Sequence, residues 1–278
     1  MLILEGLGTI IDFFKMSKNQ ENSSDDLTIY VDEFEYRQMR PSDREKVVPL
    51  MAKYLGGDEP VNVAFAKKFK MSMEEKIKND TKLWNLWFDN ANSTSLSSVI
   101  IDTSKNGEIA GLMIAQDASF KAEEVAEQLA KNKVESGGKM MFGEAFWQME
   151  DALKQKAPEH IRPLLSAKGQ TAYFWGALIK PEYRCRNLGA MGGIHGMQLS
   201  VAQGYKYQYT VATNINTIKL AAKIPGVSKA STIDVKDFEV DGIKPFELLS
   251  EANRYATVLF RVLQGDESSL TLKMKPKL

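Results

Sequence analysis

Apolar residues in the first part of this 278-residue chain follow two different spacings. Residues 27–39 alternate apolar and polar side chains, with a slip of one position, and predict a first β-strand. Residues 42–55 carry apolar side chains at helical spacing behind a Ser-x-x-Glu capping box, and Gly56-Gly57 predicts the end of that helix. A second helical pattern begins at Val61, so two helices are expected after the first strand.

The middle of the chain predicts a hairpin and then a helical insertion. Residues 98–103 and 109–115 are β-rich, and the Asn-Gly turn signal lies between them. Residues 122–134 and 142–156 then show helical periodicity before the central strand begins. Two alternatives remain for this insertion: one wall of a substrate pocket, or a helical layer that only packs on the sheet.

The central stretch consists of a strand, a basic loop and a helix. Residues 173–179 form a compact apolar and aromatic run, 183–190 a turn-prone loop, and 191–203 a helical pattern. Such a loop suits a phosphate, because unpaired backbone N–H groups and the positive end of the helix dipole point outward together. Arg184 and Arg186 add two cations. This stretch therefore predicts a phosphate-bearing ligand.

The last third of the chain continues the alternation of strand and helix. The pattern predicts strands at 205–212 and 255–262, a short helix at 214–224, a mixed stretch at 230–240 and a turn at Asp241-Gly242.

Composition limits the partners and the compartment. Lys plus Arg and Asp plus Glu number 36 each, so no overall field attracts nucleic acid or an anionic membrane. No run of about 18 apolar residues predicts a membrane span. A single cysteine excludes a disulfide framework within the chain and favours a reducing compartment, here expected to be the cytoplasm. The only two histidines, His160 and His195, argue against a metal site.

The N-terminal region differs in character from the rest. Residues 1–16 are apolar, but Glu5 interrupts them and no basic leader precedes them, so they make a poor signal peptide. Residues 17–26 are a polar linker expected to lack order. The alternative for the apolar part is an amphipathic anchor or a partner-binding helix.

The loop at 184–189 resembles the Arg/Gln-x-x-Gly-x-Gly/Ala signature of the GNAT superfamily of acyl-CoA N-acyltransferases. Arg184 and Gly189 match it, and Asn187 replaces the first glycine. Asn tolerates positive φ better than other non-glycine residues, so the loop can keep its shape. The order of elements over residues 27–263 is also similar to that superfamily.

The resemblance implies a mixed α/β fold. Its central, twisted, mostly antiparallel sheet would contain a splayed pair of parallel strands, carry helices on both faces and have a helical insertion before the central strand. It also implies an N-acetyltransferase domain over 27–264, between a flexible extension at 1–26 and a tail at 265–278.

The same resemblance implies which residues hold acetyl-CoA as co-substrate, without a metal. Backbone groups of Leu178 and Ile179 would pair with the pantetheine arm. The pyrophosphate would lie on the loop, and Asn214 would contact the coenzyme. The loop residues implied are Arg184, Arg186, Asn187, Leu188, Gly189 and Ala190, with Arg186 on either the pyrophosphate or the ribose phosphate.

Asp58-Glu59-Pro60 resembles the Asp-Glu-Pro-Leu motif of insect-type arylalkylamine (dopamine) N-acetyltransferases, with Val61 at the leucine position. The resemblance implies that Glu59 is the general base. Desolvation would raise the pKa of Glu59 and a helix dipole would lower it, and the sequence leaves both open. The alternative is that these residues only cap a helix whose first turn holds Pro60.

The helix at 214–224 resembles the superfamily's helix beside the thiol. Thr217 falls at its small or hydroxyl position, and Ala221 stands where many members carry a tyrosine acid. Thr217 or a water is therefore expected to protonate the thiolate, unless Thr213 and Thr217 only satisfy local backbone groups.

Together these signals predict acetyl-CoA-dependent N-acetylation of a small primary amine, with arylalkylamines first, by direct attack in a ternary complex. The alternatives are a polyamine, an amino acid or a protein N-terminus as acceptor, or a non-catalytic acyl-CoA-binding protein.

Overall fold

The computed structural model describes residues 27–89, 91–120, 140, 142–221, 224 and 226–263. The predicted extension at 1–26, the predicted helix at 122–134 and the predicted tail at 265–278 lie outside these residues.

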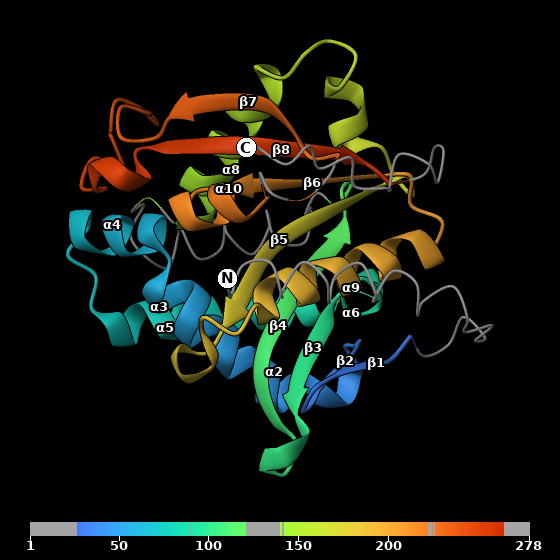
Figure 1. Ribbon diagram of the computed structural model, residues 1–278. Helices are drawn as coiled ribbons and strands as arrows, with labels where there is room; N and C mark the ends of the chain where they lie inside the picture. The colour runs from blue at the N-terminus through green and yellow to red at the C-terminus, as the bar shows by residue number, and fades with distance from the viewer. Residues whose placement is uncertain are drawn as a thin grey trace, which may run out of the picture.

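Within the described residues, eight strands form one sheet in the order β1-β2-β3-β4-β5-β6-β8-β7. The strands are β1 (Ile29–Val31), β2 (Phe34–Gln38), β3 (Ser98–Asp102), β4 (Glu108–Asp117), β5 (Thr171–Ile179), β6 (Tyr207–Ala212), β7 (Ser228–Asp234) and β8 (Tyr255–Val262). Neighbouring strands are antiparallel except β5 and β6, which run parallel. The sheet twists strongly, so that β8 crosses the direction of β3 (Figure 1).

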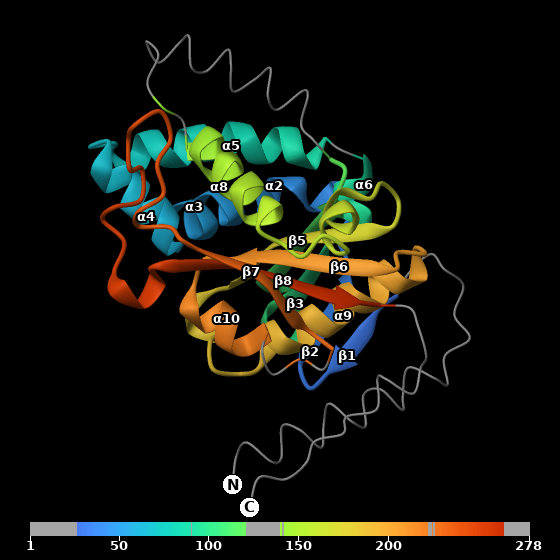
Figure 2. The same cartoon turned by 90° about the horizontal axis from the view of Figure 1, so that it is seen from above.

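Helices cover both faces of the sheet (Figure 2). One face carries α2 (Arg44–Leu50), a π-helical turn (Met51–Leu55), α3 (Gly56–Asp58), α4 (Pro60–Lys68), α5 (Met73–Phe88), α6 (Ala91–Ser95) and α8 (Phe142–Gln155). The other face carries α9 (Leu188–Ala202) and α10 (Ile215–Ala221). Short 3-10 turns lie at Pro41–Asp43, Thr103–Lys105, Arg162–Ser166, Pro181–Tyr183 and Glu251–Asn253. None of the helices in the described ranges combines the length and the apolar character needed to cross a bilayer.

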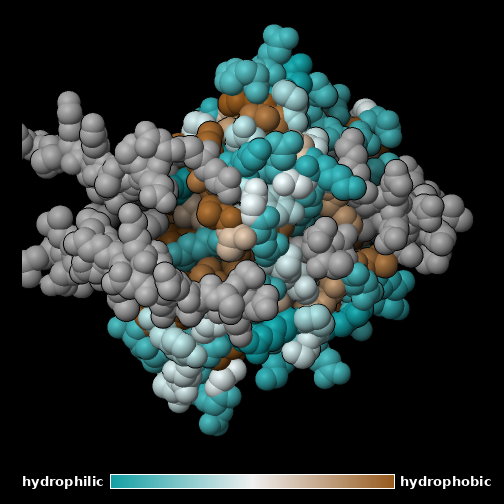
Figure 3. All heavy atoms as spheres, turned by 90° about the vertical axis from the view of Figure 1, so that its right-hand side faces the viewer, coloured by the Kyte–Doolittle hydropathy of each residue, from teal (hydrophilic) through white to brown (hydrophobic). Residues whose placement is uncertain are grey.

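Three main apolar clusters hold these layers together. One joins α2 and α5 to β3 and β4, one joins α9 to β2 through β5, and one joins α4 and α8 to β5, β6, β7 and β8. Among the residues that Figure 3 colours, hydrophilic ones predominate on this side, with apolar patches between them. Apolar burial therefore lies inside the layers, where it contributes most of the stability.

The segment at 27–39 is a hairpin, not the single strand that its alternation predicts. Asp32 has a φ of 53°, in the left-handed region, and turns the chain between β1 and β2. The shift of one position in the apolar pattern is explained by this turn, which separates the two strands. Asp is among the residues that tolerate the left-handed region, which is why a two-residue turn forms without glycine.

The first helical region also differs from its prediction. Gly56 and Gly57 do not end it, because the chain stays helical through Asp58 and leaves the helix at Glu59, which has φ −71° and ψ 129°. The residue before a proline disfavours the helical region, so Pro60 sets the boundary. The predicted capping box does not form, since it is Asp43 that accepts the Arg40 backbone N–H at 2.8 Å.

The predicted hairpin between β3 and β4 and the predicted turn at 241–242 are both present, but the sequence pattern does not predict strand β7. Asn106 and Gly107 have φ values of 52° and 71° between β3 and β4, and Asp241-Gly242 is a turn as expected. The stretch at 230–240 is described as mixed by its sequence, yet β7 lies at its start and pairs with β8. As an edge strand, β7 carries a polar outer side that hides its period.

Candidate functional site

The parallel strands β5 and β6 separate part of the way along their length. Their pairing runs from Thr171–Tyr207 to Phe174–Thr210 and then stops. Beyond that point β5 continues to Ile179 and β6 to Ala212 without further pairing between them. A cavity of about 880 Å³ lies at this opening and is also lined by α9 and α10. The splayed parallel pair expected from the sequence is present.

The register of β5 decides which of its backbone groups face the opening. Lys180 donates its N–H to the Ala110 carbonyl at 3.0 Å. Because hydrogen-bonded pairs alternate in an antiparallel ladder, the backbone groups of Leu178 face β4, whereas those of Ala177 and Ile179 face the opening. Of the two residues expected to pair with a pantetheine arm, the geometry therefore suits Ile179 and turns the backbone of Leu178 away.

A β-bulge reorients the middle of β5. Ile114 pairs with Gly176 and Ala115 with Phe174, which leaves Trp175 as the extra residue. The Trp175 ring lies 5.4 Å from that of Trp84 and stacks on Phe146 at 5.5 Å between centroids. Trp175 therefore lines the opening and also closes the apolar layer above it.

The loop after β5 carries a row of free backbone donors. Cys185 and Asn187 have φ values of 65° and 58°, and Asn187 precedes the first turn of α9. Among the described residues, no acceptor takes the backbone N–H groups of 185–189. Asn187 thus adopts the conformation expected of the glycine it replaces. Free amides at a helix N-terminus are the geometry that holds a phosphate.

The two arginines of this loop point to different places. Arg184 lines the large cavity, donates from Nε to the Ile179 carbonyl at 3.2 Å and lies 3.6 Å from an Asp58 oxygen. Arg186 pairs with Glu33 and lies 4.5 Å from the centre of the Phe34 ring. The structure therefore brings Arg184 to the cavity and holds Arg186 against the β1–β2 turn.

Glu59 caps α4 and lies where two cavities meet. Its Oε2 accepts the Asn62 backbone N–H at 3.1 Å, and its Oε1 accepts the Thr213 hydroxyl at 2.7 Å. Burial raises the pKa of Glu59 above its ordinary value, although both hydrogen bonds oppose the shift. Of the two effects that the sequence leaves open, desolvation dominates. The alternative that Glu59 caps a helix is therefore also correct, since Glu59 caps α4, and the same carboxylate faces both cavities.

The second cavity, of about 60 Å³, lies on the helical side of Glu59 and has a mostly apolar wall with several aromatic rings. Its aromatic lining comes from Trp84 of α5, Trp175 of β5, and Phe142, Phe146 and Trp147 of α8. Helix α8 therefore forms one wall of a pocket, and it also packs on the sheet through Met149 and Leu153. That this pocket receives the acceptor stays a prediction.

An ion pair closes the end of this aromatic pocket. Lys76 and Asp80 lie one turn apart on α5, with Nζ and Oδ2 2.5 Å apart, and Lys76 is only 2% exposed. Burial raises the pKa of Asp80, and the Lys76 charge opposes the shift. The Lys76 ammonium also lies 5.2 Å from the centre of the Phe142 ring. The pocket therefore contains Glu59 and an already neutralised Asp80 as its carboxylates.

A tyrosine clasp, made of Tyr173, Tyr209, Glu150 and Lys154, marks the last paired part of β5 and β6. The two rings are parallel with centroids 4.5 Å apart, and their hydroxyls donate to the two Glu150 oxygens at 3.1 Å each. Lys154 pairs with the same carboxylate at 2.6 Å. Burial raises the pKa of both tyrosines, so they remain hydroxyl donors. The clasp ties α8 to the two strands where their separation begins.

Residues at the start of α10 have local and longer-range roles. Asn214 accepts the Asn216 N–H at 2.9 Å and lines the large cavity. Thr217 is exposed and also lines that cavity, but Thr213 is the threonine that bonds to Glu59. Ala221 is buried against α10's own cluster.

The cavity brings together most of the predicted site. It is lined by Glu59, Leu178, Ile179, Arg184, Gly189, Asn214 and Thr217, whereas Arg186, Asn187, Leu188 and Ala190 are not part of its wall. Two contacts of the site were not predicted from the sequence: the bond from Thr213 to Glu59 and the pair formed by Lys76 and Asp80. For the latter a signal exists, since both fall on the helical stripe that continues through Trp84.

Comparisons with known proteins agree on the fold. No protein-family model matches this sequence, and no curated protein matches it significantly. Among solved structures, arylalkylamine N-acetyltransferase 2 from Aedes aegypti is similar with a TM-score of 0.65 and 12% identity, over 84% of this chain and 100% of that one. The polyamine N-acetyltransferase of Drosophila melanogaster has a TM-score of 0.59 and 14% identity, over 82% and 99%.

A third neighbour widens the chemistry found on this fold. The C-terminal condensation domain of Ebony, solved with beta-alanyl-dopamine, has a TM-score of 0.55 and 15% identity, over 82% of this chain and 98% of that one. The chain has the mixed α/β fold of the GNAT N-acetyltransferases, and the resemblance drawn from its sequence is confirmed at the level of the fold.

Proposed function

We propose that this chain is an acyl-CoA-dependent N-acyltransferase that acetylates a small primary amine, with an arylalkylamine as the preferred acceptor. The observation that carries the proposal is the position of Glu59. Its carboxylate has a raised pKa. On one side it faces the large cavity beside the loop at 184–190, called here the phosphate-type loop, and on the other side it faces the aromatic pocket. A base between two substrate cavities is what acyl transfer to an amine requires.

The large cavity fits coenzyme A. Free amides at 185–189 and the Arg184 guanidinium suit its pyrophosphate, and the backbone of Ile179 suits the amides of its pantetheine arm. Gly193 of α9 widens the groove, since a Cβ placed there meets nothing within 4 Å. When bound, the coenzyme supplies the acyl group as a thioester.

Glu59 carries the proton transfer in this proposal. The acceptor loses a proton to the Glu59 carboxylate, directly or through a water, while Thr213 holds that carboxylate in place through its 2.7 Å bond. The amine nitrogen then forms a bond to the acyl carbon as the carbon–sulfur bond breaks. The electron pair leaves with sulfur, and a proton from Thr217 or a water completes the thiol.

The small cavity favours an aromatic monoamine over a polyamine. Aromatic side chains in its wall suit an aryl group, for which the cavity of about 60 Å³ would have to widen, and Lys76 already neutralises Asp80. Glu59 is then the pocket's one carboxylate without an ion pair among the described residues, so it can receive one ammonium group but no second. The single cysteine, Cys185, is free and exposed, which suits a reducing compartment such as the cytoplasm.

The test is Glu59→Gln, assayed by thiol release from acetyl-CoA with a panel of phenethylamine-type amines, polyamines and short peptides. Loss of the base is expected to lower kcat/KM by about 10²–10⁴-fold. In the wild type, kcat/KM should fall as the pH drops through the raised pKa of Glu59, and the variant should lack this decline. Glu45→Gln, an exposed change on α2, is the control.

Two results would contradict this proposal. Undiminished turnover by the Glu59→Gln variant would remove Glu59 from the mechanism. Calorimetric binding of acetyl-CoA without turnover of any amine would indicate a non-catalytic acyl-CoA-binding protein, and preference for polyamines or peptides would replace the acceptor class.

A further inference from the structure

Arg261 of β8 is a buried cation without a carboxylate partner. Its exposed fraction is 6%, and its Nη1 lies 2.6 Å from the sulfur of Met197. Its Nε is buried without an acceptor, and within the described part of the chain no carboxylate lies within ion-pair distance of it. The molecule therefore holds a guanidinium whose donors are largely unused.

Other shielded arginines of the molecule are paired. Arg37 bonds to Asp43 through two contacts of 2.8 Å, and Arg254 reaches Asp234 at 2.6 Å. An unpaired charge in the interior destabilises the fold, because its hydration is lost without compensation. Keeping Arg261 in this state is explained most simply if an anionic ligand completes the site.

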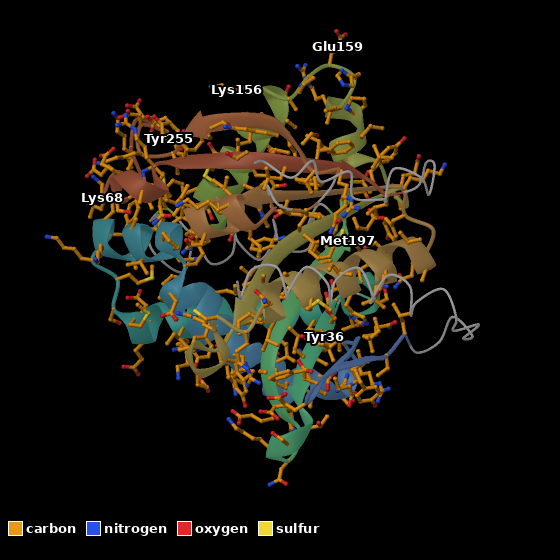
Figure 4. All side chains as sticks on the ribbon, in the orientation of Figure 1. Tyr36, Lys68, Lys156, Glu159, Met197 and Tyr255 are labelled. Atoms are coloured by element: carbon orange, nitrogen blue, oxygen red, sulfur yellow. The ribbon has the colours of Figure 1, made fainter. Side chains whose placement is uncertain are left out.

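Arg261 lines the large cavity together with two further donors. It pairs with Gln208 across β6 and β8, and Thr210 lies on the same face of β6 one step along. The side chains of Gln208 and Thr210 make no hydrogen bond within the described residues. Met197 closes this end from the side of α9 that faces the sheet (Figure 4). A guanidinium, an amide and a hydroxyl thus surround one apolar-walled space.

The position of this space separates it from the phosphate-type loop. The pairing of β5 and β6 ends at Phe174 and Thr210, and Ile179 lies five residues further along β5, about 17 Å away. Gln208 lies two residues in the opposite direction, about 7 Å beyond the end of the opening. An acyl chain that starts in the opening and runs away from the coenzyme would reach Arg261 with a few methylene groups.

We propose that this end of the cavity is an acyl-chain pocket that selects thioesters of dicarboxylic acids, such as succinyl-CoA or glutaryl-CoA, over neutral acyl groups of the same length. The terminal carboxylate would receive an N–H donor from the Arg261 guanidinium and one donor each from Gln208 and Thr210. The inference rests on the proposed acyltransferase function and adds a second class of donor to acetyl-CoA. The bonds made and broken are those given above, and the product is an amide with a free carboxylate.

The experiment compares matched thioesters as donors for one amine. Succinyl-CoA is paired with butyryl-CoA and glutaryl-CoA with valeryl-CoA, so that each pair differs in the terminal carboxylate, and acetyl-CoA is the reference. The expected result is a kcat/KM at least about 10-fold higher for one dicarboxylic donor than for its neutral match. Arg261→Met should lower that value about 10–100-fold and leave acetyl-CoA within about 3-fold.

Two further variants test whether the effect of Arg261→Met is specific to the proposed pocket. Thr210→Val removes one hydroxyl donor and should lower the dicarboxylic activity without changing the acetyl activity. Arg44→Met removes an arginine from α2, on the other face of the sheet, and should change neither. The melting temperature of Arg261→Met should equal or exceed that of the wild type, because the variant loses an uncompensated charge.

The outcomes separate this inference from the proposed function. If acetyl-CoA is turned over and neither dicarboxylic donor exceeds its neutral match, the pocket assignment is wrong and the acyltransferase proposal stands. If no thioester is bound or turned over, both are wrong. If Arg261→Met weakens calorimetric binding of free coenzyme A as much as that of succinyl-CoA, then Arg261 holds the coenzyme and the inference is overturned.

Discussion

Two neighbouring glycines of α9 should respond in opposite ways to the same added methyl group. A Cβ on Gly192 would lie 2.8 and 2.9 Å from two atoms of Met113 and 3.0 Å from Ile100, inside the core. A Cβ on Gly193 would meet nothing within 4 Å, because this residue faces the cavity. The pair therefore tests at once how the helix is packed and which of its sides is open.

The magnitudes follow from two opposing effects. Alanine in a helix interior is about 1 kcal/mol more favourable than glycine. Overpacking a dense core costs about 1–3 kcal/mol. Gly193→Ala should therefore gain about 1 kcal/mol in the free energy of unfolding, and Gly192→Ala should lose about 1 kcal/mol. For a domain of this size the two melting temperatures should differ by about 4–8 °C.

Denaturant unfolding followed by circular dichroism measures the stabilities, and calorimetry with coenzyme A measures the second consequence. Because its methyl group enters the groove, Gly193→Ala should be more stable and yet bind the coenzyme more weakly than the wild type. Equal shifts in stability for the two variants, or unchanged coenzyme affinity in Gly193→Ala, would refute this account of α9.

Two other predictions concern pH and the loop arginines. His195 is buried, its Nε2 lies 2.9 Å from the Leu27 carbonyl, and burial lowers its pKa from 6.5 to about 4. As the pH falls, the unfolded chain therefore binds the His195 proton first. The contribution of neutral His195 to the free energy of unfolding is fully present above pH 6.5, and the free energy of unfolding falls by about 3 kcal/mol as the pH approaches 4. His195→Gln should lose this part of the pH dependence in urea unfolding at pH 7 and 4.5, and an unchanged slope would contradict it. Arg184→Gln should weaken coenzyme binding by about 2–5-fold, less at high salt, whereas Arg186→Gln should not, and a reversed order in calorimetry would show that the loop is used differently.

Sequence signals succeed where a conformation is decided by the residues themselves. The left-handed backbone of Asn187 and the turn at Asn106-Gly107 follow from what asparagine and glycine tolerate, and both form as predicted. The glycine pair at 56–57 misleads, because Pro60 restricts its predecessor more strongly than glycine weakens a helix. Local rules thus fail mainly where two of them compete.

The site depends more on contacts between distant segments. Arg186 and Glu33 are 153 positions apart, and Thr213 and Glu59 are 154 apart, so no spacing along the chain announces either contact. Motif resemblance points to Glu59 and to the loop at 184–190 as candidates, because motifs store such tertiary relations. It gives no sign of Arg261, whose importance becomes visible only when its lack of a partner is seen in three dimensions.

Three consecutive residues of β6 have consequences for how this cavity can change. Tyr209 belongs to the clasp on one face of the strand, and its neighbours Gln208 and Thr210 line the cavity on the other face. The clasp links β5 and β6 through Glu150 next to the last pair of their ladder, and so limits how far the two parallel strands can separate. If the acyl-chain proposal holds, the depth of the cavity and its selectivity depend on adjacent side chains of β6, so a variant that lengthens the cavity should also alter the donors at its far end.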